Sequence, residues 1–128
     1  MICPYCGAEA QLMDSEVIYG RSFGYAWVCS NFPSCDSYVG CHPSTKKPLG
    51  TLANTELRRW RNQAHEAFDP LWKSRKMRRS TAYRQLSEKM QLPPEQCHIG
   101  MFSIDQCRKV IQIYGGIKFM ANTNPAHI

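Results

Sequence analysis

The chain lacks any long hydrophobic run. None of its apolar stretches approaches the ~18 residues that a membrane-spanning helix needs. The N-terminus, Met-Ile-Cys-Pro, also lacks the basic region leading into an apolar stretch that marks a secretory signal. These absences predict a cytoplasmic protein. Internal repeats and low-complexity segments are absent as well, so 128 residues predict one ordinary domain or two very small ones.

Acidic residues are scarce in the middle of the chain. Residues 41–92 carry twelve lysines and arginines against four acidic residues, a net charge of +8. Residues 1–40 have a net charge of −3, and residues 93–128 have a net charge of +1. A basic middle segment is typical of proteins that bind a polyanion such as nucleic acid. An ordinary basic surface would give the same pattern.

Cysteine is abundant, with seven residues in 128. In a reducing cytoplasm disulfides are rare, and clustered cysteines more often bind metal. The sequence CPYCG separates Cys3 and Cys6 by two residues, so a tight turn eased by Gly7 can direct both thiols at one ion. Cys29 and Cys35 are the best candidates for the other two ligands. Four thiolates predict one closed, structural Zn²⁺ site, which replaces the core that so short a segment cannot build.

The fourth ligand has alternatives just beyond Cys35. Cys41 and His42 follow in the same cysteine-rich block, CSNFPSCDSYVGCH. Cys41 could equally be a small buried apolar residue.

The hydrophobic periodicity changes along the chain and indicates an α+β fold. Partial alternation predicts two strands of a hairpin, over 11–19 and 22–29, with Phe23, Tyr25 and Trp27 on one face of the second. A linker follows over 42–50. Apolar residues then recur at helical spacing and predict about three helices. The first begins at Asn54 or Thr55 and ends or bends at Pro70, the second is capped by Ser80 and stops at Pro93, and the third begins in a capping box formed by Ser103 and Gln106 and stops at Gly115.

These elements predict an N-terminal zinc ribbon over residues 1–45 and a basic helical part over residues 46–128. We expect the ribbon to pack against the helices in one shared core. Trp60, Phe68 and Trp72 are the candidates to bridge the two parts.

The ribbon resembles a known zinc ribbon. The stretch CPYCG…WVCSNFPSC is similar to the C-terminal ribbons of bacterial type IA topoisomerases. The resemblance covers residues 3–36 of this chain, and it includes Ser30, Phe32 and Pro33 as well as the thiols. Those ribbons contact single-stranded DNA, partly by aromatic stacking. The resemblance therefore implies stacking faces on Tyr25, Trp27 and Phe32. The alternative is that these aromatic rings pack the hairpin against the helices, and the acidity of this ribbon argues against its being the main phosphate contact.

The chain as a whole also resembles small phage and prophage proteins that contain a zinc-finger domain. The resemblance rests on CPYCG, CSNFPSCDSYVGCH, PLGTLAN, AFDPLW and CHIGMF, and it extends from residue 3 to about residue 114. It implies an accessory protein in a bacterial cytoplasm and does not supply an activity.

The leading hypothesis is a protein that binds nucleic acid, with DNA favoured, through phosphate contacts from its basic helical segment. A protein–protein module that inhibits or redirects a host enzyme is the alternative. The candidate phosphate-binding residues are Arg58, Arg61, Lys73, Arg75, Lys76, Arg78 and Arg79.

The histidines offer a third, catalytic hypothesis. His65 and Asp69 are one helical turn apart and could form a general base or bind a metal in a nuclease. Cys97, His98 and Cys107 could form a second zinc site with Cys41 or His42. A local ion pair and a buried cysteine explain these residues as well, and no nuclease motif is complete, so the sequence favours a binding protein over an enzyme.

Overall fold

The computed structural model describes residues 1–115 and divides into two compact units. The first unit is Met1–Arg58, and the second begins at Arg59. The first unit extends past residue 45 because the segment after β3 (Tyr38–Gly40) returns to the sheet. Tyr38 and Ala53 exchange two backbone hydrogen bonds of 3.1 Å, and Cys41 forms a bridge with Pro48.

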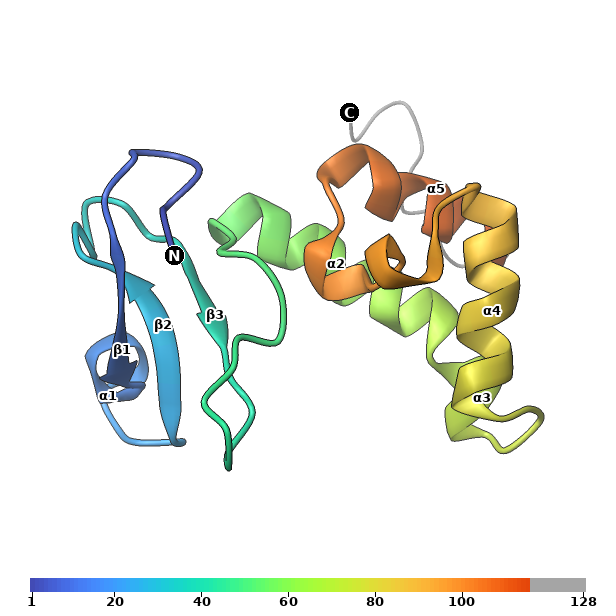
Figure 1. Ribbon diagram of the computed structural model, residues 1–128, viewed down its shortest axis with the longest axis horizontal. Coiled ribbons are helices and arrows are strands. Elements are labelled where there is room, and N and C mark those ends of the chain that lie inside the picture. The colour runs from blue at the N-terminus through green and yellow to red at the C-terminus, as the bar shows by residue number, and fades with distance from the viewer. Residues whose placement is uncertain (116–128) are drawn as a thin grey trace. The chain divides into compact units, whose positions relative to one another are not determined.

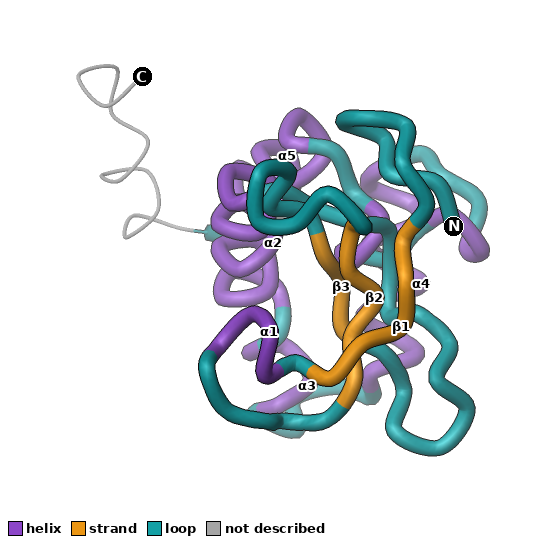
Figure 2. Tube along the Cα trace, turned by 90° about the vertical axis from the view of Figure 1, so that its left-hand side faces the viewer, coloured by secondary structure: helices purple, strands orange, loops and turns teal. Residues whose placement is uncertain are grey.

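The first unit is built on a three-stranded antiparallel sheet in the order β1-β2-β3 (Figures 1 and 2). β1 (Ala10–Asp14) pairs with β2 (Tyr25–Cys29), which confirms a hairpin, and β2 pairs with β3, a strand that the sequence did not predict. The first strand was predicted over 11–19 but ends at Asp14. Residues 16–19 instead form the short helix α1 (Glu16–Tyr19), because the Asp14 carboxylate accepts a hydrogen bond from the Glu16 amide at 2.9 Å.

The two faces of the sheet carry different side chains. Tyr25 and Trp27 share one face of β2, as predicted, but Phe23 precedes the strand and does not join them. Its ring contacts Tyr19 edge-on at 5.6 Å, and Tyr19 contacts Tyr38 at 6.1 Å. Tyr38 is aligned with Val28 in the register, so it lies on the face opposite Trp27.

The core of the first unit is small. Its buried cluster consists of Cys3, Ala10, Cys29 and Leu52, with Trp27 and Val39 among the partly buried residues packed on it. Two of the four buried residues are predicted metal ligands. So small a cluster contributes little burial energy, which is the situation in which a bound metal supplies folding free energy.

The second unit contains the remainder of α2 (Thr55–Phe68), α3 (Pro70–Lys73), α4 (Arg79–Met90) and α5 (Ile104–Tyr114), with 3₁₀ turns at Pro94–Gln96 and Ile99–Met101 (Figure 1). The capping box at Ser103 and Gln106 is confirmed, with hydrogen bonds of 3.2 and 2.9 Å. The predicted cap at Ser80 is wrong. α4 begins at Arg79, because the extended residue Arg78 precedes it.

The core of the second unit brings α2, α4 and α5 together. Phe68, Leu86, Phe102 and Val110 are fully buried in it. Trp60 and Trp72 pack against this cluster, so the three predicted bridging residues all belong to the second unit.

The observed sheet and helices confirm the α+β class. No helix within residues 1–115 is long and apolar enough to cross a bilayer.

Candidate metal centre

Two tight turns present the four predicted thiols. In the first, the Cys3 amide donates to the Ala8 carbonyl at 2.8 Å, and the Gly7 amide donates to the Cys3 carbonyl at 2.9 Å. Gly7 has φ 78°, a left-handed conformation that glycine adopts without strain. In the second turn, the Cys35 amide donates to the Asn31 carbonyl at 3.0 Å. Each turn therefore folds back on itself and holds its two cysteines on the same side.

The four Sγ atoms lie within 4.8 Å of one another. Cys3 and Cys35 are 3.6 Å apart, and Cys6 and Cys29 are 3.4 Å apart. Tetrahedral zinc with bonds of about 2.3 Å places its sulfur ligands about 3.8 Å from one another. A disulfide bond would be about 2.05 Å long, and all four cysteines are free. The cluster thus fits one structural Zn²⁺ ion, which would hold the two turns together.

The four thiols differ in their surroundings. Burial raises the pKa of Cys29 to about 12, and a bound cation would offset this cost of burying a thiolate. Burial also acts most strongly on Cys3, but hydrogen bonds, led by the one from Ser37, together lower its pKa to about 6. The exposed Cys6 has a lowered pKa, chiefly because of a hydrogen bond from the Ala8 amide.

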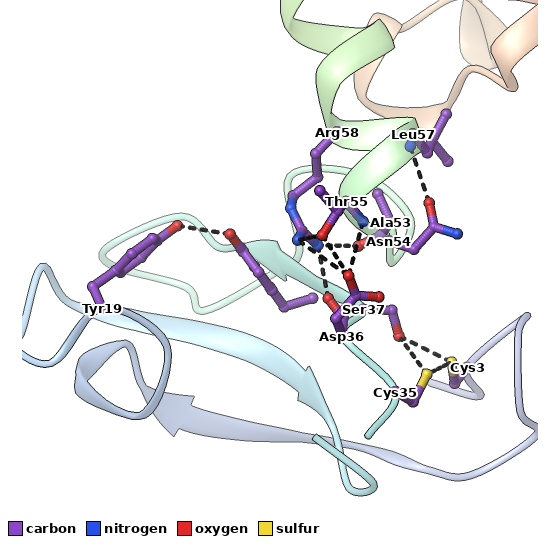
Figure 3. A network of polar contacts seen from close by, with 11 residues as sticks. Cys3, Tyr19, Cys35, Asp36, Ser37, Ala53, Asn54, Thr55, Leu57 and Arg58 are labelled. Carbon is purple, nitrogen blue, oxygen red and sulfur yellow. Dashed lines mark hydrogen bonds and ion pairs between the residues drawn. The ribbon is translucent and has the colours of Figure 1, made fainter. Parts of the chain in front are cut away.

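Ser37 contacts two of the four ligands, Cys3 and Cys35 (Figure 3). Its hydroxyl lies 3.0 Å from the Sγ of Cys3 and 3.5 Å from that of Cys35, and the residue is fully buried. A thiolate only accepts hydrogen bonds, so in the metal-bound centre the hydroxyl is the donor. Sequence analysis did not identify Ser37, because a serine beside a cysteine-rich turn has no distinguishing pattern. Asn31 approaches Cys6 in a similar way, at 3.5 Å.

The remaining metal-ligand candidates lie elsewhere. Among residues 1–115, the four-cysteine group is the only cluster of three or more histidine, cysteine or carboxylate ligand atoms. Cys41 lies outside it, with its Sγ 3.3 Å from the Tyr25 carbonyl. Cys97 and Cys107 are buried in the apolar core of the second unit, and burial raises the pKa of Cys107 to about 11. The ring of His98 lies 5.8 Å from that of Tyr83.

His65, in the last turn of α2, and Asp69, the residue that follows the helix, form a local ion-pair geometry. The Nδ1 atom of His65 lies 3.1 Å from Oδ2 of Asp69, and the Lys73 ammonium is 3.9 Å from the same oxygen. These contacts account for the spacing that suggested a general base.

Arg58 contributes to the zinc-bearing unit instead of presenting a free charge (Figure 3). Its guanidinium donates to the Asp36 carbonyl at 2.9 Å and to the Ala53 carbonyl, and it lies 3.8 Å from the centroid of the Tyr38 ring. The Asp36 carboxylate also accepts hydrogen bonds from Thr55, which are the main reason that its pKa is lowered. Arg58 therefore fastens the start of α2 to the segment that follows Cys35.

The other predicted phosphate-binding residues divide into two groups. Arg61 is buried, with 7% of its surface exposed, and its Nε donates to the Phe102 carbonyl at 3.0 Å. The others are exposed on α3, on the loop after it and at the start of α4; they are Lys73, Arg75, Lys76, Arg78 and Arg79.

The three predicted stacking rings do not form one platform. Trp27 is half-buried, and its Nε1 donates to the Lys46 carbonyl at 2.8 Å. The Lys46 ammonium lies 4.9 Å from the centroid of the Tyr25 ring on the same face. The ring of Phe32 contacts Tyr38 at 6.5 Å, on the opposite face of the sheet.

Comparison with known proteins places the chain in a family. A family model described as a zinc-finger-containing domain matches residues 1–116. No curated protein matches the chain, and no solved structure does. The family description agrees with the four-cysteine cluster and one structural zinc ion. The chain belongs to this family of zinc-finger-containing domains.

Proposed function

We propose that the protein binds nucleic acid through its second unit, with the zinc centre maintaining the fold of the first. The observation that carries the proposal is an acid-free stretch. Between Asp69 and Glu88 the chain has no acidic residue. The same stretch holds the exposed cluster Lys73, Arg75, Lys76, Arg78 and Arg79, which we call the basic loop.

Aromatic rings support this charge at both ends of the loop. The Arg79 guanidinium lies 5.4 Å from the Trp72 ring and 4.7 Å from the Tyr83 ring. The Lys73 ammonium lies 5.7 Å from the same Trp72 ring. Cation–π contacts of this kind restrict the side chains without neutralising them. A positive cluster with little opposing charge attracts phosphates without regard to sequence.

Arg58 and Arg61 have a different part in this proposal. Their guanidinium groups make hydrogen bonds to backbone carbonyls within the protein. We therefore assign them to the fold and leave phosphate binding to the basic loop.

The setting that we propose is that of a phage or prophage accessory protein acting on DNA in the cytoplasm of a bacterial host. The support is the resemblance of the cysteine block and the AFDPLW and CHIGMF segments to small phage proteins.

Fluorescence anisotropy tests the proposal, with single-stranded DNA, duplex DNA and RNA titrated at several salt concentrations. The logarithm of the affinity should fall steeply with the logarithm of salt concentration, by about 0.9 per phosphate neutralised on duplex DNA. Replacing Arg75, Lys76, Arg78 and Arg79 by alanine should nearly abolish binding and reduce that slope by up to about 3.6.

A matched control separates the basic loop from overall charge. The pair Arg59→Ala and Lys109→Ala removes the same charge as Arg75→Ala and Lys76→Ala, from exposed positions on α2 and α5. Equal losses from the two pairs would contradict the proposal. No binding at low salt would overturn it and favour a host-protein partner, which should then appear in a pull-down that survives nuclease treatment.

A further inference from the structure

The exposed face of α4 differs from those of the other long helices. Ser80 and Arg84 are exposed and Thr81 and Gln85 are half-buried, and their spacing of one and four residues puts them on one side of the helix. The opposite side holds the buried residues Ala82, Leu86 and Met90. The helix is therefore fixed on the core and presents four polar side chains outward.

These four side chains are chemically suited to reading base pairs. Arginine pairs with the acceptor atoms of guanine, glutamine pairs with adenine, and serine and threonine bond to several base edges. No carboxylate interrupts this face before Glu88, near the end of α4. By contrast, α2 exposes Glu56 and Glu66, and α5 exposes Asp105. α4 is thus the long helix of the second unit that can approach a polyanion without charge repulsion along its first turns.

The position of α4 along the chain adds to this argument. The basic loop leads directly into it, because Arg78 is the residue before the first turn and Arg79 is the first helical residue (Figure 1). A recognition helix in the major groove has this arrangement, since its N-terminal half meets the base edges while neighbouring basic groups hold the phosphates. Its 12 residues span about 18 Å, and the major groove is about 12 Å wide, which admits an α-helix.

The C-terminal end of α4 is also firmly held. Gln91 caps it in the left-handed conformation, and the Ser87 hydroxyl donates to the Leu92 carbonyl at 2.5 Å. Side chains on a fixed helix keep the geometry that base recognition requires.

We propose that α4 enters the major groove of duplex DNA, where Arg84 and Gln85 contact base edges and the basic loop holds the flanking phosphates. This inference rests on the proposed function and adds to it a ligand class, duplex DNA, and the residues that determine sequence preference. Ser80 and Thr81 lie at the N-terminal end of the same face.

The experiment is selection of the full chain, with zinc bound, on a randomised DNA duplex, followed by affinity measurements on the selected site and on single-base variants of it. Arg84→Ala and Gln85→Ala should each remove the preference at one base pair, a loss of discrimination of roughly 5- to 150-fold. Arg78→Ala should weaken binding to all sequences alike and leave the preference unchanged. The exposed α2 variant Arg59→Ala is the control and should alter neither property.

The outcomes separate the two proposals. Tighter binding to single strands than to duplex, or a duplex preference that both α4 variants retain, would overturn the recognition helix while salt-dependent binding by the basic loop still stood. Failure to bind any nucleic acid would overturn both. Circular dichroism melts of each variant test whether unfolding causes a loss of binding. We expect every variant to keep its fold, because all four substituted side chains lie outside the buried core.

Discussion

Replacing Ser37 by alanine should weaken zinc binding while the four ligands stay in place. The Ser37 hydroxyl lies 3.0 Å from Sγ of Cys3 and 3.5 Å from Sγ of Cys35, so it can donate to either thiolate. The residue is fully buried, which means that water cannot take over the hydrogen bond in the variant. Its backbone carbonyl, which accepts from the Cys29 amide at 3.1 Å, is unaffected by the substitution.

The size of the effect follows from the charge of the acceptor. A hydrogen bond to a charged group contributes about 1.5–3 kcal/mol, and loss of a residue that supports a metal ligand typically lowers metal affinity 10- to 100-fold. These two ranges agree, because tenfold corresponds to about 1.4 kcal/mol. We therefore expect the zinc dissociation constant of Ser37→Ala to rise 10- to 100-fold.

A competition titration against a chromophoric zinc chelator at neutral pH measures this change. Ser34→Ala is the matched control, because it removes a hydroxyl from an exposed position in the turn between Cys29 and Cys35. An unchanged affinity in Ser37→Ala, or an equal loss in Ser34→Ala, would refute the role of the Ser37 hydroxyl. Melting with zinc in excess shows whether the variant retains its fold.

Three further predictions concern the metal and the fold. Cys29→Ser should lower the zinc content, measured by mass spectrometry, well below one ion per chain, and stoichiometric zinc in this variant would contradict the assignment. Removal of zinc from the wild-type protein with a chelator should abolish hydrogen-exchange protection in β1 and β2. Arg58→Ala should destabilise the protein by about 2–3 kcal/mol in urea unfolding, because it loses hydrogen bonds to two carbonyls and its contact with a tyrosine ring, whereas the exposed neighbour variant Arg59→Ala should change stability little. Gln91→Gly should stabilise by about 0.5–1 kcal/mol, since Gln91 has φ 56°, and a lower melting temperature would count against strain at that cap.

Most of the fold was predictable because its signals are local. Apolar spacing identified the long helices, and the capping box at Ser103 depends on residues three positions apart. Errors arose where short-range polar contacts overrode the pattern. The first strand was expected to continue past Asp14, but it ends there because the Asp14 carboxylate accepts a hydrogen bond from the Glu16 amide. The strand β3 was not predicted, because its three residues become a strand only by pairing with β2.

The zinc site and the basic residues also differ in what the sequence determined and what only folding decided. Only the folded chain decided that Cys35, and not Cys41 or His42, completes the cluster. The sequence alone determined that a zinc site is present, since close thiol pairs with a hairpin between them have few other uses. It also determined that positive charge is concentrated in the middle of the chain. Only the tertiary structure decided which of those charges reach solvent. Arg58 and Arg61 have the same charge as Arg75 and Arg78 in the sequence, but folding directs the first two onto backbone carbonyls distant along the chain and leaves the other two exposed. Ser37 likewise acquires its role only when the segment after Cys35 brings it to Cys3, because a contact between residues so far apart exists only in the folded chain.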